Sequence, residues 1–257
     1  MCFDHDSLPP LAPMAGAAID SHSLELLAAD GNRFAAFRAD AAKPSGTGII
    51  VLPDVRGLFP YYEELALRFA EMGVDAIAID YFGRTAGASA RDAEFEYMPH
   101  VHSTTWPGLQ ADVAAAAADL RAERGVTALF SVGFCFGGRI SMLLAGLASL
   151  DMRGVIGFYG QPAMPHDNGM PAAADVAAGF RCPVLAIYGG SDPGITPQQV
   201  ATYEAALTAA GVQHSIVTYP DAPHSFFDRK QDTYVDASAA AWGEVLAFID
   251  TGTRQPD

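Results

Sequence analysis

The sequence predicts an α/β fold with a mostly parallel central sheet and helices on both of its faces. Two observations lead to this prediction. Short apolar runs that are typical of buried strands alternate along the chain with longer segments of helical periodicity. The chain has 257 residues, half of them hydrophobic, which suits one large domain with a sizeable core. We therefore expect a single domain over residues 1–257, in which residues 1–20 form an extended N-terminal arm.

The first half of the chain begins with a predicted pair of antiparallel strands. Alternating residues at 23–27 and 33–39 flank Asp30-Gly31-Asn32, which indicates a hairpin at one edge of the sheet. The elements expected next are a strand over 48–52, a helix over 61–72, a strand over 74–79, an irregular segment over 81–107 and a helix over 109–124.

The second half continues the alternation of strands and helices. Pro197 in a first turn and Gly211 at a last one mark the bounds of one helix in particular. The expected elements are strands over 127–132, 154–158, 183–188 and 214–219, and helices over 138–145, 196–211 and 233–249. In such sheets, sites form beyond the carboxyl ends of the strands.

Composition restricts the partners of the protein. A net charge of −15 and an isoelectric point near 4.6 disfavour a nucleic-acid or anionic-membrane surface. Three cysteines without metal-like spacing indicate a reducing compartment. The N-terminus lacks the features of a signal peptide, and no apolar run approaches the roughly 20 residues of a membrane span. We expect a cytoplasmic protein, as a monomer or small homo-oligomer.

The most informative stretch is Gly133-Phe134-Cys135-Phe136-Gly137, which has the form Gly-x-nucleophile-x-Gly. It joins a predicted strand to a predicted helix, so Cys135 is expected on the sharp turn that α/β-hydrolases use as a nucleophile elbow. The helix N-terminus favours a thiolate there, and the N–H of Phe136 can face a developing oxyanion. The alternative is that Cys135 is a small core residue. The flanking glycines and the strand–helix context favour catalysis.

Two further residues complete a predicted triad. Hydrolases of this topology carry nucleophile, acid and histidine in that chain order. His224 follows the last predicted strand and is the expected base, while Asp192 follows the preceding strand and is expected to orient the imidazole. As alternatives, His224 is a surface residue and Asp192 serves only its own turn. The order Cys135, Asp192, His224 favours the triad.

No metal or organic cofactor is predicted. His100 and His102 lie in the irregular segment without a nearby cysteine or run of carboxylates, which makes them a weak metal signal. We expect these two histidines to line a loop or a pocket wall.

These residues resemble the dienelactone hydrolase family, the cysteine-nucleophile branch of the α/β-hydrolases. The resemblance covers residues 22–250. It rests on the stretches Gly133-Phe134-Cys135-Phe136-Gly137-Gly138, Tyr188-Gly189-Gly190-Ser191-Asp192 and Pro223-His224-Ser225-Phe226. Members open cyclic enol-lactones that carry a carboxylate. The resemblance implies the same triad, and an oxyanion hole formed by the N–H groups of Phe136 and Val55.

The resemblance also implies substrate contacts. Arg84 stands where the family carries an arginine for the substrate carboxylate, with a plain surface arginine as the alternative. Asp54 stands where the family has a glutamate that contacts the thiol, and it is one methylene shorter. Arg56 is expected either to add a cation at the rim of the site or to pair with Asp54. At the place of the family's second substrate arginine stands Asp228, followed by Arg229.

The predicted function is hydrolysis of a small ester or lactone through a thioester acyl-enzyme. The expected substrate is an anionic, carboxylate-bearing enol-lactone. One alternative is an esterase or thioesterase of the same fold with a different substrate. Another is a non-catalytic binding protein on a hydrolase scaffold, which an intact triad disfavours.

Overall fold

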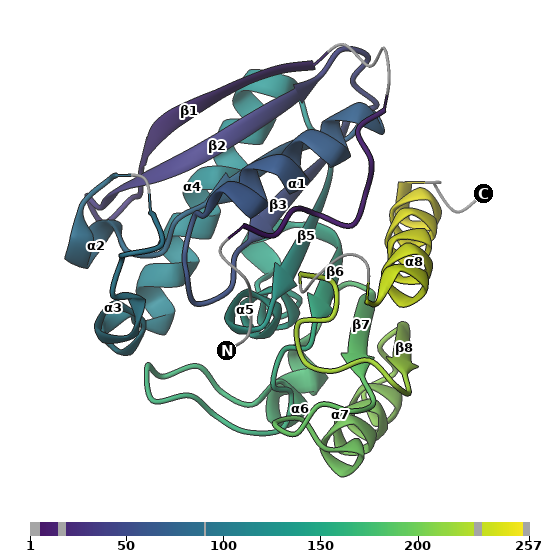
Figure 1. Ribbon diagram of the computed structural model, residues 1–257. Helices are drawn as coiled ribbons and strands as arrows, with labels where there is room; N and C mark the ends of the chain where they lie inside the picture. Colours follow the sequence, from purple (N-terminus) through teal and green to yellow (C-terminus); the bar gives the residue numbers. More distant parts are fainter. Residues whose placement is uncertain (1–5, 15–18, 90, 229–232, 254–257) are drawn as a thin grey trace. The chain divides into compact units, whose positions relative to one another are not determined.

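A computed structural model describes residues 6–14, 19–89, 91–228 and 233–253 of the protein (Figure 1). The chain divides into two compact units. The N-terminal unit comprises Ala12–Leu129 and His166–Met170. The C-terminal unit comprises Met1–Leu11, Phe130–Pro165 and Pro171–Asp257. The single domain expected from the sequence stays a prediction, and part of the expected arm (residues 1–5 and 15–18) lies outside the described residues.

The N-terminal unit contains the strands β1, β2, β4 and β3, which neighbour one another in that order (Figure 1). β1 (Ile19–Leu27) and β2 (Arg33–Ala41) are antiparallel, so the predicted hairpin is confirmed. The turn between them has Gly31 at φ 88°, a conformation that suits glycine. β4 (Asp75–Ile79) is antiparallel to β2 and parallel to β3 (Thr47–Leu52).

Two long helices of the N-terminal unit match the sequence pattern. α1 (Pro60–Glu71) begins with a proline, which the first turn of a helix tolerates. α4 (Trp106–Arg124) begins at Thr105, whose hydroxyl accepts the N–H of Gly108, and it ends at the left-handed Gly125. Both predicted helices are therefore confirmed.

The segment expected to be irregular, 81–107, contains two short helices instead. α2 (Gly83–Ala86) and α3 (Tyr97–Ser103) span only four and seven residues, too few for a periodic pattern to show. Tertiary contacts support them: the ring of His100 in α3 stacks on Phe95 at 4.9 Å, and its Nδ1 lies 2.8 Å from the hydroxyl of Thr85 in α2. The prediction was wrong here because packing, rather than periodicity, stabilises these turns.

The strands of the C-terminal unit follow the order β5, β6, β7, β8 (Figure 1). They are β5 (Ala128–Phe134, of which Phe130 onward belongs to this unit), β6 (Met152–Phe158), β7 (Val184–Gly189) and β8 (His214–Tyr219). β6, β7 and β8 are parallel, so their carboxyl ends lie at one edge. Each predicted strand is confirmed with small shifts at its ends.

The helices of the C-terminal unit lie between these strands in the chain or, for the last of them, follow β8. They are α5 (Phe136–Leu144), α6 (Ala173–Val176), α7 (Pro197–Ala209) and α8 (Val235–Thr253), with single 3₁₀ turns at Ala148–Leu150 and Ala177–Gly179. α7 begins with a capping box, in which Thr196 and Gln199 satisfy one another's backbone N–H groups. The short α6 was not predicted. The predicted α/β class, a mostly parallel sheet with helices, is confirmed.

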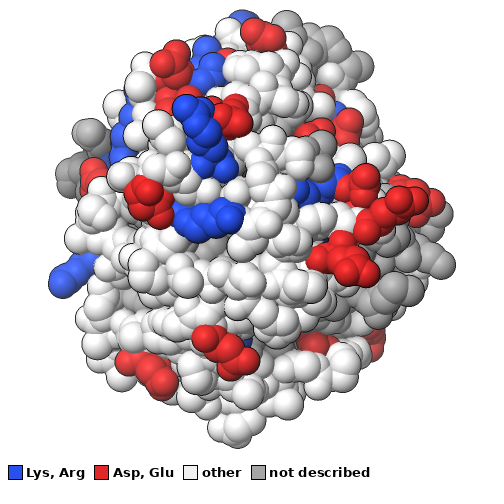
Figure 2. All heavy atoms as spheres, turned by 90° about the vertical axis from the view of Figure 1, so that its left-hand side faces the viewer, with Lys and Arg blue, Asp and Glu red and all other residues white. Residues whose placement is uncertain are grey.

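Charges of opposite sign lie next to one another on the surface. On the face drawn in Figure 2, the central Lys and Arg side chains lie beside Asp and Glu. Pairs such as Arg33–Glu25 and Arg84–Asp30 illustrate this arrangement. None of the helices in the described residues combines the length with the hydropathy that a membrane-spanning segment needs.

Two helical glycines provide a test of how closely α5 approaches β6. A Cβ at Gly138 in α5 would collide with the carbonyl oxygen of Phe158, whereas a Cβ at Gly243 in α8 would meet nothing within 4 Å. Within a helix, alanine is more stable than glycine by about 1 kcal/mol. An extra methyl group forced into a packed interior typically costs about 1–3 kcal/mol. We expect Gly243→Ala to raise the free energy of unfolding in urea and Gly138→Ala to lower it. Equal effects of the two substitutions would contradict the close approach.

Candidate active site

The backbone at Cys135 makes a strained turn between β5 and α5. Cys135 has φ 53° and ψ −107°, although residues with a Cβ rarely adopt positive φ. Its N–H donates to the carbonyl of Phe158 at 3.0 Å, and its own carbonyl accepts the N–H of Arg139 at 3.1 Å. The strained turn predicted for the elbow is therefore present, and the half-buried thiol stands at the N-terminus of α5.

His224 and Asp192 are in direct contact within the same unit. Nδ1 of His224 lies 2.6 Å from Oδ2 of Asp192. The other carboxylate oxygen, Oδ1, accepts the N–H groups of Gly194 at 2.7 Å and Ile195 at 3.2 Å. Burial alone would raise the pKa of Asp192, but the bond to His224 and these two N–H groups lower it below its usual value. Asp192 is therefore an anion at neutral pH.

This contact defines how the imidazole can act. Because an ionised carboxylate only accepts hydrogen bonds, Nδ1 of His224 must carry a proton. Nε2 is then the nitrogen left to exchange protons with a reacting group. The ring packs against Tyr159 with the two centroids 5.0 Å apart, and Tyr159 itself follows β6. The Asp192–His224 pair thus has the orientation that a general base requires.

The two loops that carry Asp192 and His224 are bonded to each other. The N–H of Ser191 donates to the carbonyl of Ala222 at 3.0 Å, and the N–H of Gly190 donates to the carbonyl of Tyr219 at 2.7 Å. The hydroxyl of Ser191 also donates to the carbonyl of Pro220. These bonds fix the histidine loop against the aspartate loop through main-chain groups.

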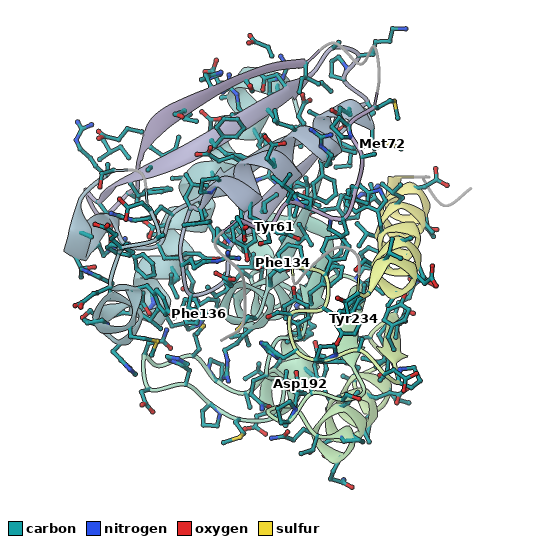
Figure 3. All side chains as sticks on the ribbon, in the orientation of Figure 1. Tyr61, Met72, Phe134, Phe136, Asp192 and Tyr234 are labelled. Atoms are coloured by element: carbon teal, nitrogen blue, oxygen red, sulfur yellow. The ribbon has the colours of Figure 1, made fainter. Side chains whose placement is uncertain are left out.

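An aromatic cluster supports the elbow and the histidine loop together. Phe134 precedes Cys135, and its ring stacks on Phe158 of β6 at 4.8 Å. Phe227, three residues after His224, packs on Phe158 at 4.9 Å. Figure 3 labels Phe134 and Phe136, on either side of Cys135, together with Asp192. Such rings bury large apolar areas, so the cluster packs the ends of β5 and β6 against the loop that carries His224.

Asp54 and Arg56 form a buried ion pair in the N-terminal unit. Nε and Nη2 of Arg56 contact the carboxylate of Asp54 at about 3 Å, and the N–H of Arg56 donates to the same carboxylate. The guanidinium also lies over the ring of Phe59 at 4.9 Å. Of the two roles expected for Arg56, pairing with Asp54 is the one observed. Val55, the second expected oxyanion donor, lies in the turn that this pair closes.

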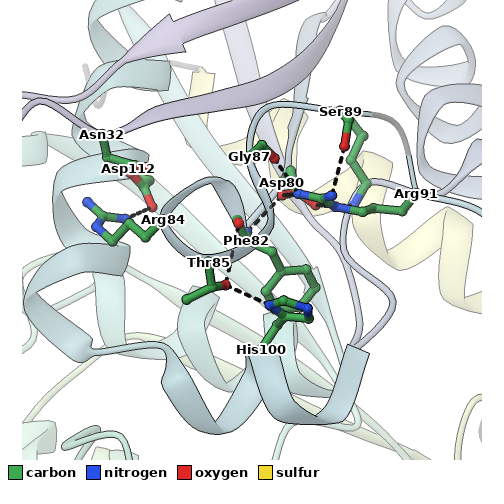
Figure 4. Close-up of polar contacts among 11 residues, drawn as sticks. Asn32, Asp80, Phe82, Arg84, Thr85, Gly87, Ser89, Arg91, His100 and Asp112 are labelled. Atoms are coloured by element: carbon green, nitrogen blue, oxygen red, sulfur yellow. Dashed lines mark hydrogen bonds and ion pairs between the residues drawn. The ribbon is translucent and has the colours of Figure 1, made fainter. Parts of the chain in front are cut away.

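Arg84 is held by two carboxylates, of which Figure 4 shows Asp112. Its Nη1 bonds to Asp112, whose side chain is 1% exposed, and its Nη2 lies 2.6 Å from Asp30, which is 47% exposed. Burial raises the pKa of Asp112, while its bonds to Arg84 and Asn32 act in the opposite direction. The guanidinium that was expected to bind a substrate carboxylate therefore already forms ion pairs with two acidic side chains of the protein.

Sequence reasoning missed two buried arginines. Arg91 bonds to Asp80 through Nε and Nη2 and donates to Ser89 (Figure 4). Its guanidinium also lies over the ring of Phe95 at 4.6 Å. No motif marked Arg91. For Arg139 the signal was available, because the residue lies four positions after Cys135 on a predicted helix.

The described residues contain no group of three or more His, Cys, Asp or Glu side chains placed to hold a metal ion. His100 and His102 lie in the helix α3 rather than in a loop, and His100 contacts Thr85 and Phe95 there. Cys182 is buried, and burial raises the pKa of its thiol to about 12, so this cysteine is inert at neutral pH. Arg229 lies outside the described residues.

A strained residue between strand and helix, followed by an acid and a histidine beyond two later strands, defines the α/β-hydrolase class. Residues 34–252 match the model of the dienelactone hydrolase family. The chain therefore belongs to the dienelactone hydrolase family and is a hydrolase of that family, as the sequence motifs predicted.

Similarity to known proteins supports this family assignment. A candidate carboxymethylenebutenolidase of Escherichia coli K12 is 28% identical over 261 residues, which cover 94% of this chain and 93% of that protein. A candidate 2-oxo-3-(5-oxofuran-2-ylidene)propanoate lactonase of Bradyrhizobium sp is 28% identical over 217 residues, 81% of this chain and 86% of that protein. The crystal structure of a candidate dienelactone hydrolase from Klebsiella pneumoniae superposes with a TM-score of 0.80 at 26% identity, covering 91% of this chain and 99% of that one.

Proposed function

We propose that this protein hydrolyses a small lactone or ester through Cys135, His224 and Asp192, with a thioester acyl-enzyme as intermediate. The observation that carries the proposal is the 2.6 Å contact between Nδ1 of His224 and the carboxylate of Asp192. It occurs in the unit that also holds Cys135 on its strained turn. An imidazole oriented in this way beside a family nucleophile motif supports acyl transfer.

In the acylation step, the Cys135 thiolate attacks the carbonyl carbon and forms a carbon–sulfur bond. The carbonyl π electrons move to oxygen, and the N–H groups of Phe136 and Val55 are proposed to stabilise that oxyanion. As the carbonyl re-forms, the bond to the leaving oxygen breaks with its electron pair. Nε2 of the His224 imidazolium gives that oxygen its proton, and Asp192 stabilises the imidazolium until then.

In the deacylation step, a water molecule attacks the thioester carbonyl. Nε2 of His224 takes one proton from the water, and the resulting tetrahedral intermediate expels the thiolate. The product carboxylic acid leaves, and Cys135 and His224 return to their starting charges. Every proton in the cycle passes through one imidazole nitrogen, which is why its orientation by Asp192 matters.

The triad predicts a pattern of mutant kinetics. Cys135→Ala should abolish turnover of an aryl ester, and His224→Ala should lower kcat by about two to four orders of magnitude, as is typical for general acid–base groups. Asp192→Asn should lower kcat by no more than His224→Ala. Because the two residues act as a unit, the loss in the double variant should be far smaller than the product of the single losses. Steady-state kinetics on folded variants check this, and multiplicative losses would contradict a coupled pair.

A carboxylate-bearing lactone is the proposed substrate. The lactonase relative from Bradyrhizobium sp is named for a furanylidene propanoate, which is an anion. Arg84 supports such a substrate if one of its partners can be exchanged. Its ion pair with Asp30 is solvent-exposed, and exposed pairs contribute only about 0–1 kcal/mol. A substrate carboxylate can therefore replace Asp30 on Nη2, while the buried Asp112 keeps Nη1.

The second candidate function is an esterase or thioesterase for neutral substrates. The observation that favours it is the occupancy of Arg84 by two carboxylates of the protein itself. The buried Arg56–Asp54 pair likewise offers no ready cation to an anionic substrate. The two candidates share the triad chemistry and differ only in the response to substrate charge.

Asp30→Asn separates these candidates without leaving a buried charge unpaired. If Arg84 binds a substrate carboxylate, removal of its exposed competitor should raise kcat/KM for carboxylate-bearing lactones about two- to fivefold, the equivalent of an exposed pair. Neutral aryl esters should be unaffected. Arg84→Lys, which loses the two-pronged donor, should lower kcat/KM for the charged lactones only, by about tenfold.

Kinetics with matched charged and neutral substrates at fixed low ionic strength measure both effects, because salt screens exposed pairs. Arg33→Lys is the control, since Arg33 forms a comparable exposed pair with Glu25 in the same unit. Equal changes on charged and neutral substrates would exclude Arg84 as a substrate ligand and favour the neutral esterase.

A further inference from the structure

Four of the five buried arginines in the described part of the chain have carboxylate partners. Their ion pairs are Arg38 with Asp40 and Asp119, Arg56 with Asp54, Arg68 with Glu64 and Glu71, and Arg91 with Asp80. Arg139 is the exception: it is 7% exposed and forms no ion pair with any carboxylate of the described residues. A buried guanidinium without a compensating negative charge is expensive, so the counter-charge of Arg139 needs to be identified.

The position of Arg139 points to Cys135. Arg139 lies in the first turn of α5, and that helix begins at the residue directly after Cys135. The main chain links the two residues directly, because the N–H of Arg139 donates to the carbonyl of Cys135 at 3.1 Å. Burial lowers the pKa of the Arg139 guanidinium, and negative charge on Cys135 acts to raise it.

The remaining polar contact of Arg139 holds a loop. Nη1 donates to the carbonyl of Met164, in the segment between β6 and α6. The same segment reaches the aspartate loop, since the side-chain amide of Gln161 donates to the carbonyl of Gly194 at 3.1 Å. One neutral amide would suffice for a bond to a carbonyl. A permanently charged guanidinium is therefore more than loop anchoring requires.

We propose that Arg139 is a positioning residue whose fixed positive charge stabilises the thiolate of Cys135. This inference rests on the proposed role of Cys135 as nucleophile and adds a second cationic source to the N-terminus of α5. The helix end supplies only a partial charge of about half a unit that falls off within one turn. Arg139 supplies a full charge that no pH in the working range removes. Asp192 and His224 are the other titratable groups of the proposed site in this unit.

The test is the pH dependence of Cys135 alkylation by iodoacetamide, followed by mass spectrometry of the peptide that contains Cys135. Only the thiolate reacts, so the profile reports thiol ionisation without any need for turnover. Cys182 does not interfere, because its buried thiol has a pKa of about 12 and its peptide is read separately. The variants are Arg139→Gln, which keeps a donor for Met164 but loses the charge, and Arg139→Lys, which keeps the charge.

In Arg139→Gln, Cys135 should be alkylated at least about tenfold more slowly than in the wild type at pH 7, since an opposite charge nearby favours the ionised thiol. The rate should reach that of the wild type only at higher pH. Arg139→Lys should remain close to the wild type. Arg153→Gln, an exposed arginine in the same unit, controls for the change in net charge. Arg139→Met keeps the apolar stem in place and serves as the neutral variant if Arg139→Gln does not fold.

The proposal is overturned if Cys135 shows the same pH profile of alkylation in the folded neutral variant (Arg139→Gln or Arg139→Met) as in Arg153→Gln. Loop anchoring would then be the only role of Arg139. It is also overturned if Arg139→Lys shifts the profile as far as the neutral variant does. Failure of the proposed function gives a different result. An active Cys135→Ala enzyme would exclude Cys135 as nucleophile while the alkylation profiles still reported on the charge of Arg139.

Discussion

The positive φ of Cys135 is the constraint on which the rest of the C-terminal unit depends. A residue with a Cβ held at φ 53° costs about 1–3 kcal/mol, so the surroundings must enforce it. The main chain does so from both sides, through the bond from Cys135 to Phe158 and the bond from Arg139 to Cys135. The close approach of Gly138 to Phe158 fixes α5 against β6. As a result, α5 begins directly at the sulfur, and the aromatic cluster around Phe134 joins this turn to the histidine loop.

Charge in this protein is organised around acids, as a net charge of −15 requires. Carboxylates therefore engage most buried arginines, Arg56 among them, and also the more exposed Arg84, where a substrate anion was expected. Asp192 differs from the other buried acids because its partner is an imidazole, which can gain and lose a proton during a reaction. Arg139 differs from the other buried arginines because it forms no ion pair with a carboxylate of the described residues, and its charge is proposed to act on the thiol of Cys135. These two exceptions lie in the C-terminal unit, which also holds the strained turn.

The sequence predicted the strands, the long helices and the contact of Asp192 with His224, because each depends on local patterns and on chain order. It failed for α2 and α3, whose few turns are stabilised by packing such as the stacking of His100 on Phe95. It also gave no sign that Asp112 engages Arg84, since that pair joins positions 28 residues apart through tertiary structure. Motifs thus predicted which residue types would stand at the strand ends, while the partner of each charge needed the three-dimensional arrangement.

The proposed chemistry depends on a covalent thioester that Cys135 forms during turnover. The most direct measurement is intact-mass analysis of the protein after acid quenching of its reaction with a slowly hydrolysed aryl ester, followed by peptide mapping. We expect a mass increase equal to the acyl group, located on the peptide that contains Cys135. The acylated fraction should be larger in Asp192→Asn, because water attack through His224 is slowed. Turnover of the same ester without an adduct in either protein, or with the adduct on another residue, would contradict this proposed chemistry.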